Sequence, residues 1–423
     1  LRPLGMSNTT LVQDLPPAVR SQVATVYQST GEALEPAPFI AVTTPATGGA
    51  SATGPEMGRF LLALLNGGEL GGVRVLSRAS VDQMFSRQFS SHSGLPGVTY
   101  GFFEHMEQGQ RGLLREGTGV GVNSRIFLVP EHNFGFFVAH NSKGEELSAE
   151  LTSAILEYFF PASDPPATPT VASVPLYRFT GQYRYVQYSR HTMGKVGSLL
   201  AGRVAVKSEA DNALLVTPLG MGDPYGGFEE TSRWLPVEPL LFQREDGKAY
   251  MAFGVDGQGR ITHLFSGAGY HGSFERLVWY QTPIFHLCLA LLLLVVFAVI
   301  LVGSVLGRVP GLHVSGSAAL AMRLLAGTIA LLAILFVSAA LPVAFTAGAV
   351  GGFPSITFID APNVLVQTLL LIPAVLMALT AGLGGVTLLL YVKGASGRQA
   401  GLLLTCVAGS LLGYLHYWRL LFI

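Results

Sequence analysis

Apolar and polar residues follow three different patterns along this chain, and each pattern predicts a different kind of structure. Over residues 1–160 the apolar positions mix helical and strand periodicities. Over residues 176–280 short apolar stretches are separated by turn residues, as in antiparallel sheets. Beyond residue 281 long apolar runs carry almost no charge. The chain therefore divides into a mixed segment, a β segment and a membrane segment.

The mixed segment, 1–160, is predicted to pack helices on a sheet. Pro55 suits the first turn of a helix that ends at Gly67-Gly68, and Ser77 is a candidate cap for the next helix. A hairpin follows, with strands at 126–129 and 134–139. The last helix is expected to bury an apolar stripe made of Leu147, Leu151, Ile155 and Tyr158. Strands followed by a terminal helix indicate a sheet with a helix on it, which is an α/β arrangement.

The stretch 161–175, "PASDPPATPTVASVP", is rich in Pro, Ala and Thr and is predicted to be a stiff linker. The next segment, 176–280, contains strand–turn–strand units with Asp-Gly in the turns, such as "FQREDGKAYMAF". Regularly spaced short hairpins favour a small antiparallel β-barrel or a sandwich. Trp234, Tyr183 and Phe274 are candidates for its core.

The membrane segment, 281–423, contains four apolar runs. Each is long enough to cross about 30 Å of hydrocarbon. The predicted transmembrane helices are 284–306, 324–345, 364–392 and 402–423.

Basic residues favour one orientation of these helices. The first and third connections carry Arg308, Lys393 and Arg398, with Arg323 at the start of the second helix, whereas the second connection has no Lys or Arg. By the positive-inside rule the first and third connections face the cytoplasm, so the first 281 residues and the C-terminus face outside.

The charge balance and the cysteines exclude several kinds of site. Residues 1–281 hold 21 basic and 25 acidic side chains, so no basic face is available for nucleic acid. Cys288 and Cys406 both lie in apolar runs, which leaves no disulfide framework and no cysteine metal site. The histidines lack the spacing of metal ligands. We therefore expect neither a metal nor a cofactor.

Several stretches of the mixed segment resemble the serine β-lactamase-related hydrolases. "LRPLGMSNT" is similar to the stretch that follows the second catalytic motif in that family. "TTPATGGASATGPEMGRFLLALLNGG" resembles its glycine-rich stretch and helix, "GVTYGFFE" the strand before the third motif, and "EGTGVGVNSRIFLVPEHNFGFFVAHN" the two strands after it. The family includes class C β-lactamases, penicillin-binding-protein-like carboxypeptidases, D-aminopeptidases and esterases. The stretch 176–280 looks like the lipocalin-like barrel of a membrane-anchored subgroup, and "FERLVWYQTPIFHL" looks like the junction of that barrel to the helices.

The resemblance implies the C-terminal half of a β-lactamase-like α/β domain, followed by the barrel and by four transmembrane helices. It also implies a bacterial inner membrane, with the soluble domains on the periplasmic or extracellular side. The family uses three motifs: Ser-x-x-Lys, Tyr-x-Asn or Ser-x-Asn, and Lys-Thr-Gly or His-x-Gly. No Ser-x-x-Lys occurs in this sequence. Thr192-Met193-Gly194-Lys195 has the spacing with threonine but lies in the barrel segment.

The third motif of the family falls on Arg115-Glu116-Gly117, counted back from "LVPEHN" without gaps. Gly117 is kept, whereas Arg115 replaces the His or Lys, and arginine holds a fixed positive charge that cannot transfer a proton. Either Arg115 binds an anionic group of the substrate, or the site has decayed and Arg115 and Glu116 form a solvated pair. His92-Ser93-Gly94 also fits His-x-Gly, but we expect it to lie in a loop.

The resemblance places the nucleophile upstream of these residues. We expect the other half of the hydrolase domain to pack here, either in the same polypeptide or as a separate chain, since the half seen here would expose apolar surface. Three functions remain open. The chain is the anchored part of an extracytoplasmic serine hydrolase, an inactive scaffold that joins other membrane subunits, or a transporter with an extracellular cap. Membrane lipid is an expected partner in each case, and nucleic acid is not.

Overall fold

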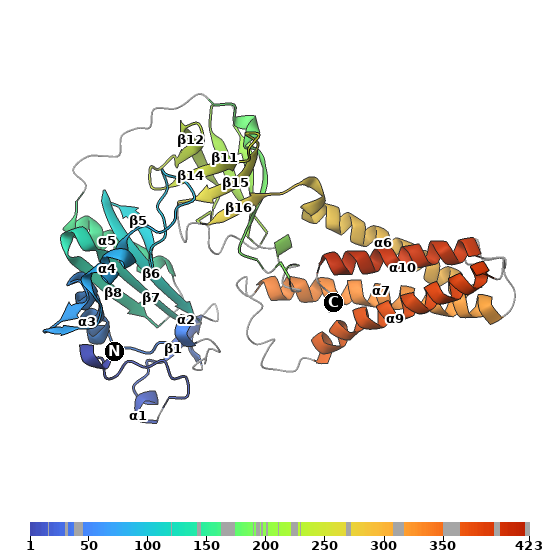
Figure 1. The fold of residues 1–423 in the computed structure, drawn as a ribbon, viewed down its shortest axis with the longest axis horizontal. Helices are drawn as coiled ribbons and strands as arrows, with labels where there is room; N and C mark the ends of the chain where they lie inside the picture. The colour runs from blue at the N-terminus through green and yellow to red at the C-terminus, as the bar shows by residue number, and fades with distance from the viewer. Residues whose placement is uncertain are drawn as a thin grey trace. The chain divides into compact units, whose positions relative to one another are not determined.

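The computed structural model describes residues 1–15, 17–29, 33–37, 45–119, 121–141, 145–161, 174–188, 190–191, 195, 198–199, 202–209, 211–220, 227–228, 230–267, 272–307, 317–349, 364–392 and 398–418. The chain forms two compact units. The first is Leu1–Ala172 with Val237–Ala252 and Phe265–His271, and the second is Ser173–Pro236, Phe253–Leu264 and Gly272–Ile423. Figure 1 shows the elements of both.

The first unit is built around a four-stranded antiparallel sheet in the order β5-β6-β7-β8 (Figure 1). The strands of the predicted hairpin are confirmed as β7 and β8, joined by a short helical turn, η2 (Pro130–His132). The four strands are β5 (Phe103–Glu107), β6 (Gln110–Gly119), β7 (Val122–Val129) and β8 (Phe134–His140).

Helices cover both faces of this sheet. The helix predicted to have Pro55 in its first turn is confirmed as α3 (Gly54–Leu65). The side chain of its cap, Thr53, accepts a hydrogen bond from the backbone N–H of Glu56. Ser77 caps the next helix, as predicted, by accepting from the backbone N–H of Ser80. The helices of this unit are α1 (Pro17–Arg20), α2 (Pro45–Gly48), α3, α4 (Arg78–Phe85) and α5 (Glu145–Phe159), with the 3-10 turn η1 (Arg2–Leu4). Two small hairpins complete it: β1 (Val26–Ser29) with β2 (Leu34–Ala37), and β3 (Glu69–Leu70) with β4 (Val73–Arg74).

Side chains alternate between the two sheet faces, so adjacent residues of one strand enter different cores. Leu113 packs with Leu61, Leu64 and Leu128 on the α3 face. Its neighbour Leu114 packs with a second set on the α5 face, which comprises Phe127, Val129 and Leu156.

The apolar stripe predicted for the last helix of the mixed segment is wrong. Leu147, Leu151 and Tyr158 of α5 are exposed, with Tyr158 at 81%. The helix instead turns Ser148, Thr152 and Leu156 toward the sheet, and these three side chains are buried. The reason is a charged group on β7: the Arg125 guanidinium donates to the Ser148 carbonyl and to the Thr152 hydroxyl, each at 3.1 Å. That buried cation requires a polar helix face, which the apolar periodicity alone does not show.

The β segment forms a closed eight-stranded barrel in which sequence neighbours pair and β9 closes against both β10 and β16. Of the two predicted alternatives, the barrel is confirmed and the sandwich is wrong. Trp234, Tyr183 and Phe274 have no exposed surface, as expected for core residues. The strands are β9 (Gly181–Tyr185), β10 (Arg203–Ser208), β11 (Leu214–Leu219), β12 (Ser232–Glu238), β13 (Leu241–Arg244), β14 (Tyr250–Val255), β15 (Ile261–Ser266) and β16 (Ser273–Arg276), after the turn η3 (Leu176–Arg178). Most of the predicted linker, 162–173, lies outside the described residues.

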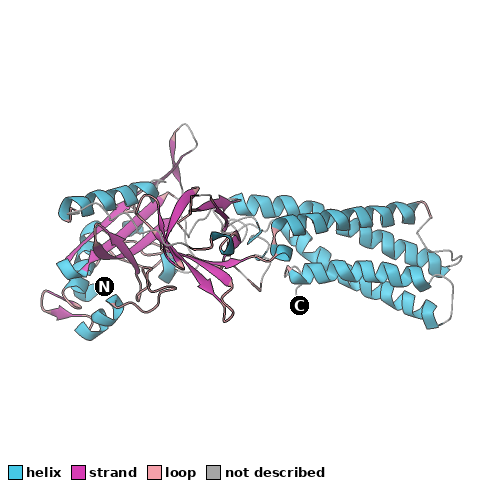
Figure 2. Cartoon of the chain, turned by 90° about the horizontal axis from the view of Figure 1, so that it is seen from above, coloured by secondary structure: helices cyan, strands magenta, loops and turns pink. Residues whose placement is uncertain are grey.

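Four helices that are long and apolar enough to cross a membrane follow the barrel and run side by side (Figure 2). The turn η5 (Trp279–Gln281) leads into the first of them. They are α6 (Pro283–Val305), α7 (Ser317–Ala349), α9 (Val364–Val392) and α10 (Arg398–Tyr417). Their number is as predicted, but α7 begins well before residue 324, so Arg323 lies within this helix and not at its start.

Phe127 is the centre of the α5-side core, and its replacement should weaken the sheet. The ring is fully buried and stacks on Phe136 with centroids 5.7 Å apart. We expect Phe127→Ala to lower the free energy of unfolding of this sheet by about 3–5 kcal/mol. Amide hydrogen exchange of β6–β8 in the full chain measures this loss.

Phe89→Ala is the matched control, because Phe89 is 63% exposed and its loss should change stability by less than about 0.5 kcal/mol. Equal loss of protection in the two variants would contradict this assignment of the core.

Candidate functional site

The end of β6 projects beyond its neighbour β5. Register pairs β5 only with residues 110–114 of β6, from Glu107↔Gln110 to Phe103↔Leu114. Residues 115–119 pair with β7 alone, from Arg115↔Ile126 to Gly119↔Val122. Within the described residues no strand pairs with the other edge of 115–119. This open edge therefore directs alternate backbone N–H and C=O groups away from β7.

Arg115 and Gly117 lie on the α3 face of this projection, on the same side of the sheet as Leu113. The Arg115 side chain is exposed, and within the described part of the chain no hydrogen bond or ion pair holds it. The structure thus places a cation and a glycine two residues apart beside an open strand edge. These are the two residues that the sequence proposed for the third motif.

Glu116 does not form a solvated pair with Arg115, because adjacent strand residues face opposite sides of the sheet. Its carboxylate pairs with Arg125, directly opposite on β7. Both side chains are largely buried, with 19% and 11% of the side-chain surface exposed. The pair is joined to α5 through Ser148 and Thr152. Glu116 therefore stabilises the strand from the α5 face, while the exposed Arg115 side chain lies on the other face.

Gly117 in the projection and Gly121 in the turn before β7 allow close approach of other groups. At Gly117 a β-carbon would lie 2.8 Å from Ser124 Oγ, and that hydroxyl is 3.4 Å from the Gly117 carbonyl oxygen. At Gly121 the φ of 69° favours glycine, and a β-carbon would lie 2.7 Å from the Tyr27 carbonyl oxygen. The β1 strand therefore lies beside the tip of the β6–β7 hairpin.

One backbone and one side-chain hydrogen bond to Asn141 hold β1 in that position. The Tyr27 N–H donates to the Asn141 carbonyl at 2.9 Å, and the Asn141 amide donates to the Thr25 carbonyl at 2.8 Å. Asn141 directly follows β8. Segments far apart in the sequence thus meet at the open end of the sheet.

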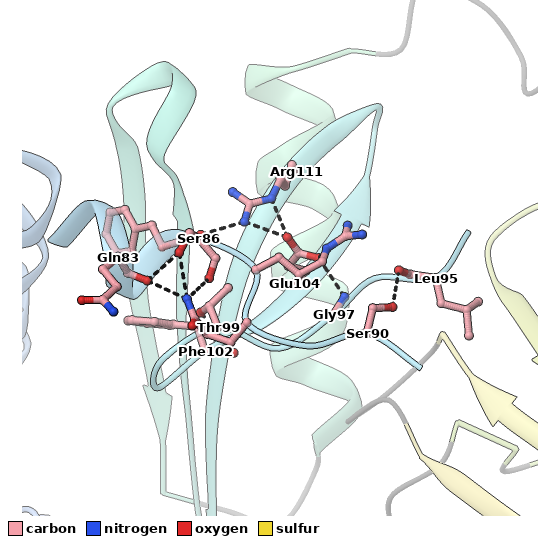
Figure 3. Close-up of polar contacts among 12 residues, drawn as sticks. Gln83, Ser86, Ser90, Leu95, Gly97, Thr99, Phe102, Glu104 and Arg111 are labelled. Carbon is pink, nitrogen blue, oxygen red and sulfur yellow. Dashed lines mark hydrogen bonds and ion pairs between the residues drawn. The ribbon is translucent and has the colours of Figure 1, made fainter. Parts of the chain in front are cut away.

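A buried ionic cluster around Glu104 holds the loop that precedes β5 (Figure 3). Only 1% of the Glu104 side chain is exposed. Its carboxylate accepts from Arg87 at 2.5 Å, from Arg111 at 2.7 Å and from the Gly97 N–H at 2.7 Å. Burial alone would raise the pKa of Glu104, but these donors outweigh it and keep the pKa below the usual glutamate value.

The Glu104 cluster connects several elements. Arg111 also donates to the Phe85 carbonyl at the end of α4, at 2.7 Å. Leu95, two residues before Gly97, packs with Leu241 and Ala252 in the same compact unit. His92-Ser93-Gly94 lies in this loop, as expected, and away from regular strands. The sequence analysis did not find this cluster, because Arg87, Gly97 and Arg111 come from separate segments that only the fold brings to Glu104.

A second carboxylate fixes the start of the described chain to α3. Glu56 accepts from the Asn8 N–H at 2.9 Å, the Asn8 amide at 3.1 Å and the Thr9 hydroxyl at 2.6 Å. The Thr9 hydroxyl is the largest of the influences that lower the pKa of Glu56. The stretch "LRPLGMSNT" is thereby held against the first turn of α3.

Sequence comparison agrees with this architecture. The β-lactamase family model matches residues 1–158. These residues belong to the β-lactamase family. Among curated proteins no sequence match to the chain was found.

Solved structures with a detectable likeness include an octameric penicillin-binding protein homologue from Pyrococcus abyssi, with 18% identity and a TM-score of 0.33 over 65% of this chain and 58% of that one. A crystal structure of SurE has 18% identity and a TM-score of 0.41, over 66% of this chain and 61% of SurE. SurE with D-Leu has 18% identity and a TM-score of 0.38, over 66% and 60%. The chain thus spans about 60% of the length of these structures.

The other catalytic candidates do not come together in this β-lactamase-family domain. Thr192 lies outside the described residues, and Lys195 belongs to the second unit. Within the described residues no group of three or more His, Cys, Asp or Glu side chains is arranged to hold a metal ion.

Glu104→Gln should destabilise the β-lactamase-family domain and change its response to acid. Loss of the buried charge leaves Arg87 and Arg111 without their shared carboxylate, at a cost of about 3 kcal/mol at neutral pH. Because the folded pKa is depressed, the stabilisation by Glu104 is complete above the unfolded value of about 4.3 and is lost as pH falls through the folded value.

The measurement is the unfolding midpoint from pH 7 to pH 3, for the parent, for Glu104→Gln and for Glu69→Gln. Glu69 pairs with Arg74 on an exposed hairpin and serves as control. The difference in unfolding midpoint between the parent and Glu104→Gln should become smaller toward pH 3. A difference that stays constant with pH would contradict the role of the Glu104 charge.

Proposed function

We propose that this chain is the membrane-anchored part of a serine hydrolase that binds its substrate along the open edge of β6. The observation that carries the proposal is the edge of β6 at 115–119 with the exposed Arg115 beside it, since neither has a partner among the residues that the structure describes. The serine nucleophile is supplied by residues outside this chain, since the sequence has no Ser-x-x-Lys. Membership of residues 1–158 in the β-lactamase family supports this chemistry.

An open strand edge suits a substrate with a peptide-like backbone. Extended peptides add to such edges through main-chain hydrogen bonds. Gly117 has no side chain to obstruct an acyl group on the α3 face. A backbone N–H on the same edge is a suitable donor for the oxyanion that forms when serine attacks a carbonyl.

The chemistry of the guanidinium group limits what Arg115 can do in a hydrolase site. Guanidinium binds carboxylate through paired hydrogen bonds and stays protonated at every physiological pH. It therefore orients a substrate carboxylate but does not act as the base that activates serine. Proton transfer falls to side chains of the upstream half. Preferred substrates accordingly carry a carboxylate near the amide or ester bond that is cut.

The four long apolar helices support an activity at a membrane surface. Four spans bring the barrel end of α6 and the end of α10 to the same side. The distribution of Arg and Lys favours the outer side for residues 1–281, which is the periplasmic or extracellular face of a bacterial inner membrane. Cell-wall peptides with a free carboxylate are found on that side.

Arg115→Gln tests the assignment in the intact protein isolated with its membrane partners. We expect labelling by fluorescent penicillin, which carries a carboxylate, to slow by about 10–100-fold, as for loss of a charged hydrogen bond. Labelling by a fluorophosphonate, which has no carboxylate, should change far less.

Arg74→Gln is the matched control, because Arg74 is exposed on the β3–β4 hairpin and pairs with Glu69. No labelling of the parent by either probe would refute hydrolase activity. Equal slowing with both probes would refute carboxylate recognition while leaving the hydrolase intact.

We further propose that the upstream half of the domain, in the same polypeptide or as a separate chain, covers the outer edge of β8 and one face of α5. Within the described residues no strand pairs with that edge of β8. An apolar hollow of about 270 Å³ lies between α3 and β8, lined by residues that include Leu61, Leu65 and Phe137. Leu147, Leu151 and Tyr158 are exposed on α5. Apolar surface of this extent is typical of a buried interface.

Cysteine accessibility tests this cover. We expect Leu151→Cys in the intact protein to react at least about tenfold more slowly with a water-soluble maleimide than Glu150→Cys, because packing protects buried groups until local opening occurs. Glu150 is the exposed neighbour of Leu151. Equal rates for the two cysteines would show that this helix face is bare.

An inactive scaffold is the alternative function. It is favoured by one observation: position 115 holds arginine where the family has a histidine or lysine able to transfer a proton. In that case the chain acts as a subunit of a membrane complex. Stable co-purification with other membrane subunits, together with no labelling by either probe, would support the scaffold over the hydrolase.

A further inference from the structure

A cluster of cations lies where the barrel meets the membrane helices within the second unit. It comprises four basic side chains and one carboxylate: Arg184, Arg190, Lys195, Arg203 and Glu275. Arg184 is 3% exposed and donates to Glu275 at 2.6 Å and to the Tyr188 hydroxyl at 2.8 Å. Arg190 reaches the other oxygen of Glu275 at 3.3 Å. One carboxylate thus serves two arginines.

Two further cations extend the cluster. Arg203 lies directly opposite Arg184 in the β9–β10 ladder, and like charges in that position repel each other. Burial is the larger of two influences that lower the pKa of Arg203, and the positive charge of Arg184 is the smaller one. The Arg184 guanidinium also donates to Ser198 Oγ at 3.2 Å, and Ser198 Oγ donates to the Lys195 carbonyl at 2.7 Å. Hydrogen bonds therefore connect Arg184, Arg190, Lys195 and Glu275, Arg203 adjoins them through the ladder, and these five described residues together carry a surplus of positive charge.

Lys195 contacts the end of the last membrane helix. Its ammonium donates to the Tyr417 carbonyl at 2.8 Å and lies 3.8 Å from the centre of the Tyr417 ring and 5.6 Å from that of Trp418. A cation at a helix C-terminus is favoured by the helix dipole. Glu275 is only eight residues before Pro283, so the chain itself keeps the cluster near the first turn of α6.

Aromatic side chains mark this level as the membrane interface. Trp279 and Tyr280 stand just before α6 and are 71% and 48% exposed. His286 in the first turn of α6 packs on Tyr417, the last residue of α10, and on Trp418, which follows it, with ring centroids 5.6 and 4.6 Å away. Trp and Tyr gather at lipid headgroup depth because one end of the ring is apolar and the other is polar. The cations therefore lie at the depth of lipid phosphates.

We propose that this cluster binds the phosphate of an anionic phospholipid in the leaflet next to the barrel. Arginine and lysine together suit a phosphate diester, and its negative charge offsets the repulsion between Arg184 and Arg203. Such a lipid holds the barrel at a set height above the bilayer. The site lies outside residues 1–158 and does not depend on hydrolase activity.

The test removes two cations that are half-buried or exposed, so that the buried Arg184 stays in place. The variant is Arg190→Gln with Lys195→Gln, and the control is Lys207→Gln with Arg233→Gln. The control removes the same charge types from the same barrel, but Arg233 pairs with Glu209 and Asp211, outside the cluster. All three full-length proteins are purified in a neutral detergent and titrated with phosphatidylglycerol, phosphatidylcholine or inorganic phosphate.

Thermal unfolding and native mass spectrometry report binding. Phosphatidylglycerol should stabilise the parent and the control equally, and its apparent affinity should fall by about tenfold or more in the Arg190/Lys195 variant. Phosphatidylcholine and inorganic phosphate should have little effect on any of them. Unchanged phosphatidylglycerol binding in that variant would overturn the site, and an equal response to inorganic phosphate would overturn its assignment to a lipid.

Discussion

The site in residues 1–158 depends on one feature of strand pairing, the extension of the β6–β7 ladder beyond the end of β5. A strand pair without a third strand is only marginally stable in water, so this projection needs support from elsewhere. The Glu116–Arg125 pair supplies that support from the α5 face, through the Ser148 carbonyl and the Thr152 hydroxyl. The Arg115 side chain lies on the other face of the projection. Among the described residues the outer edge of 115–119 has no pairing strand, because the pairing of β5 ends at Leu114.

Charged groups inside the first unit act mainly to position backbone. Glu104 brings Arg87, Arg111 and the Gly97 N–H to one carboxylate, and Glu56 does the same for the segment at Asn8 and Thr9. A buried ion pair adds little net stability compared with apolar residues, but removal of one partner is costly. Such groups therefore specify where loops lie more than how stable the domain is. In this domain both clusters fix segments that connect to α3 and α4.

Four helices that are long and apolar enough to cross a membrane follow the closed barrel, whose strands are divided between the two compact units, with β13 in the first. Closure satisfies every strand edge, so the barrel needs no partner strand, unlike the sheet of the first unit. The barrel instead gathers cations around the buried Arg184–Glu275 pair, and one of them, Lys195, donates to the Tyr417 carbonyl at the end of α10. The closed barrel and the open sheet thus differ in whether their strand edges are already paired within the described residues.

The sequence by itself determined the order of segments, the cap at Ser77, the helix with Pro55 in its first turn, the β7–β8 hairpin, the aromatic barrel core and the four long apolar helices. These features follow from local periodicity, turn residues and hydropathy, which act over a few neighbouring residues. It also placed Arg115 and Gly117 on one strand by counting from "LVPEHN". Only the tertiary structure decided that Glu116 pairs with Arg125, that α5 buries Ser148 and Thr152 and exposes Leu151, and that Glu104 and Lys195 reach distant partners. Those outcomes depend on strand register and on contacts between residues far apart in the chain. In α5 the buried Arg125 of β7 decides which helix face is buried, so the local apolar pattern does not.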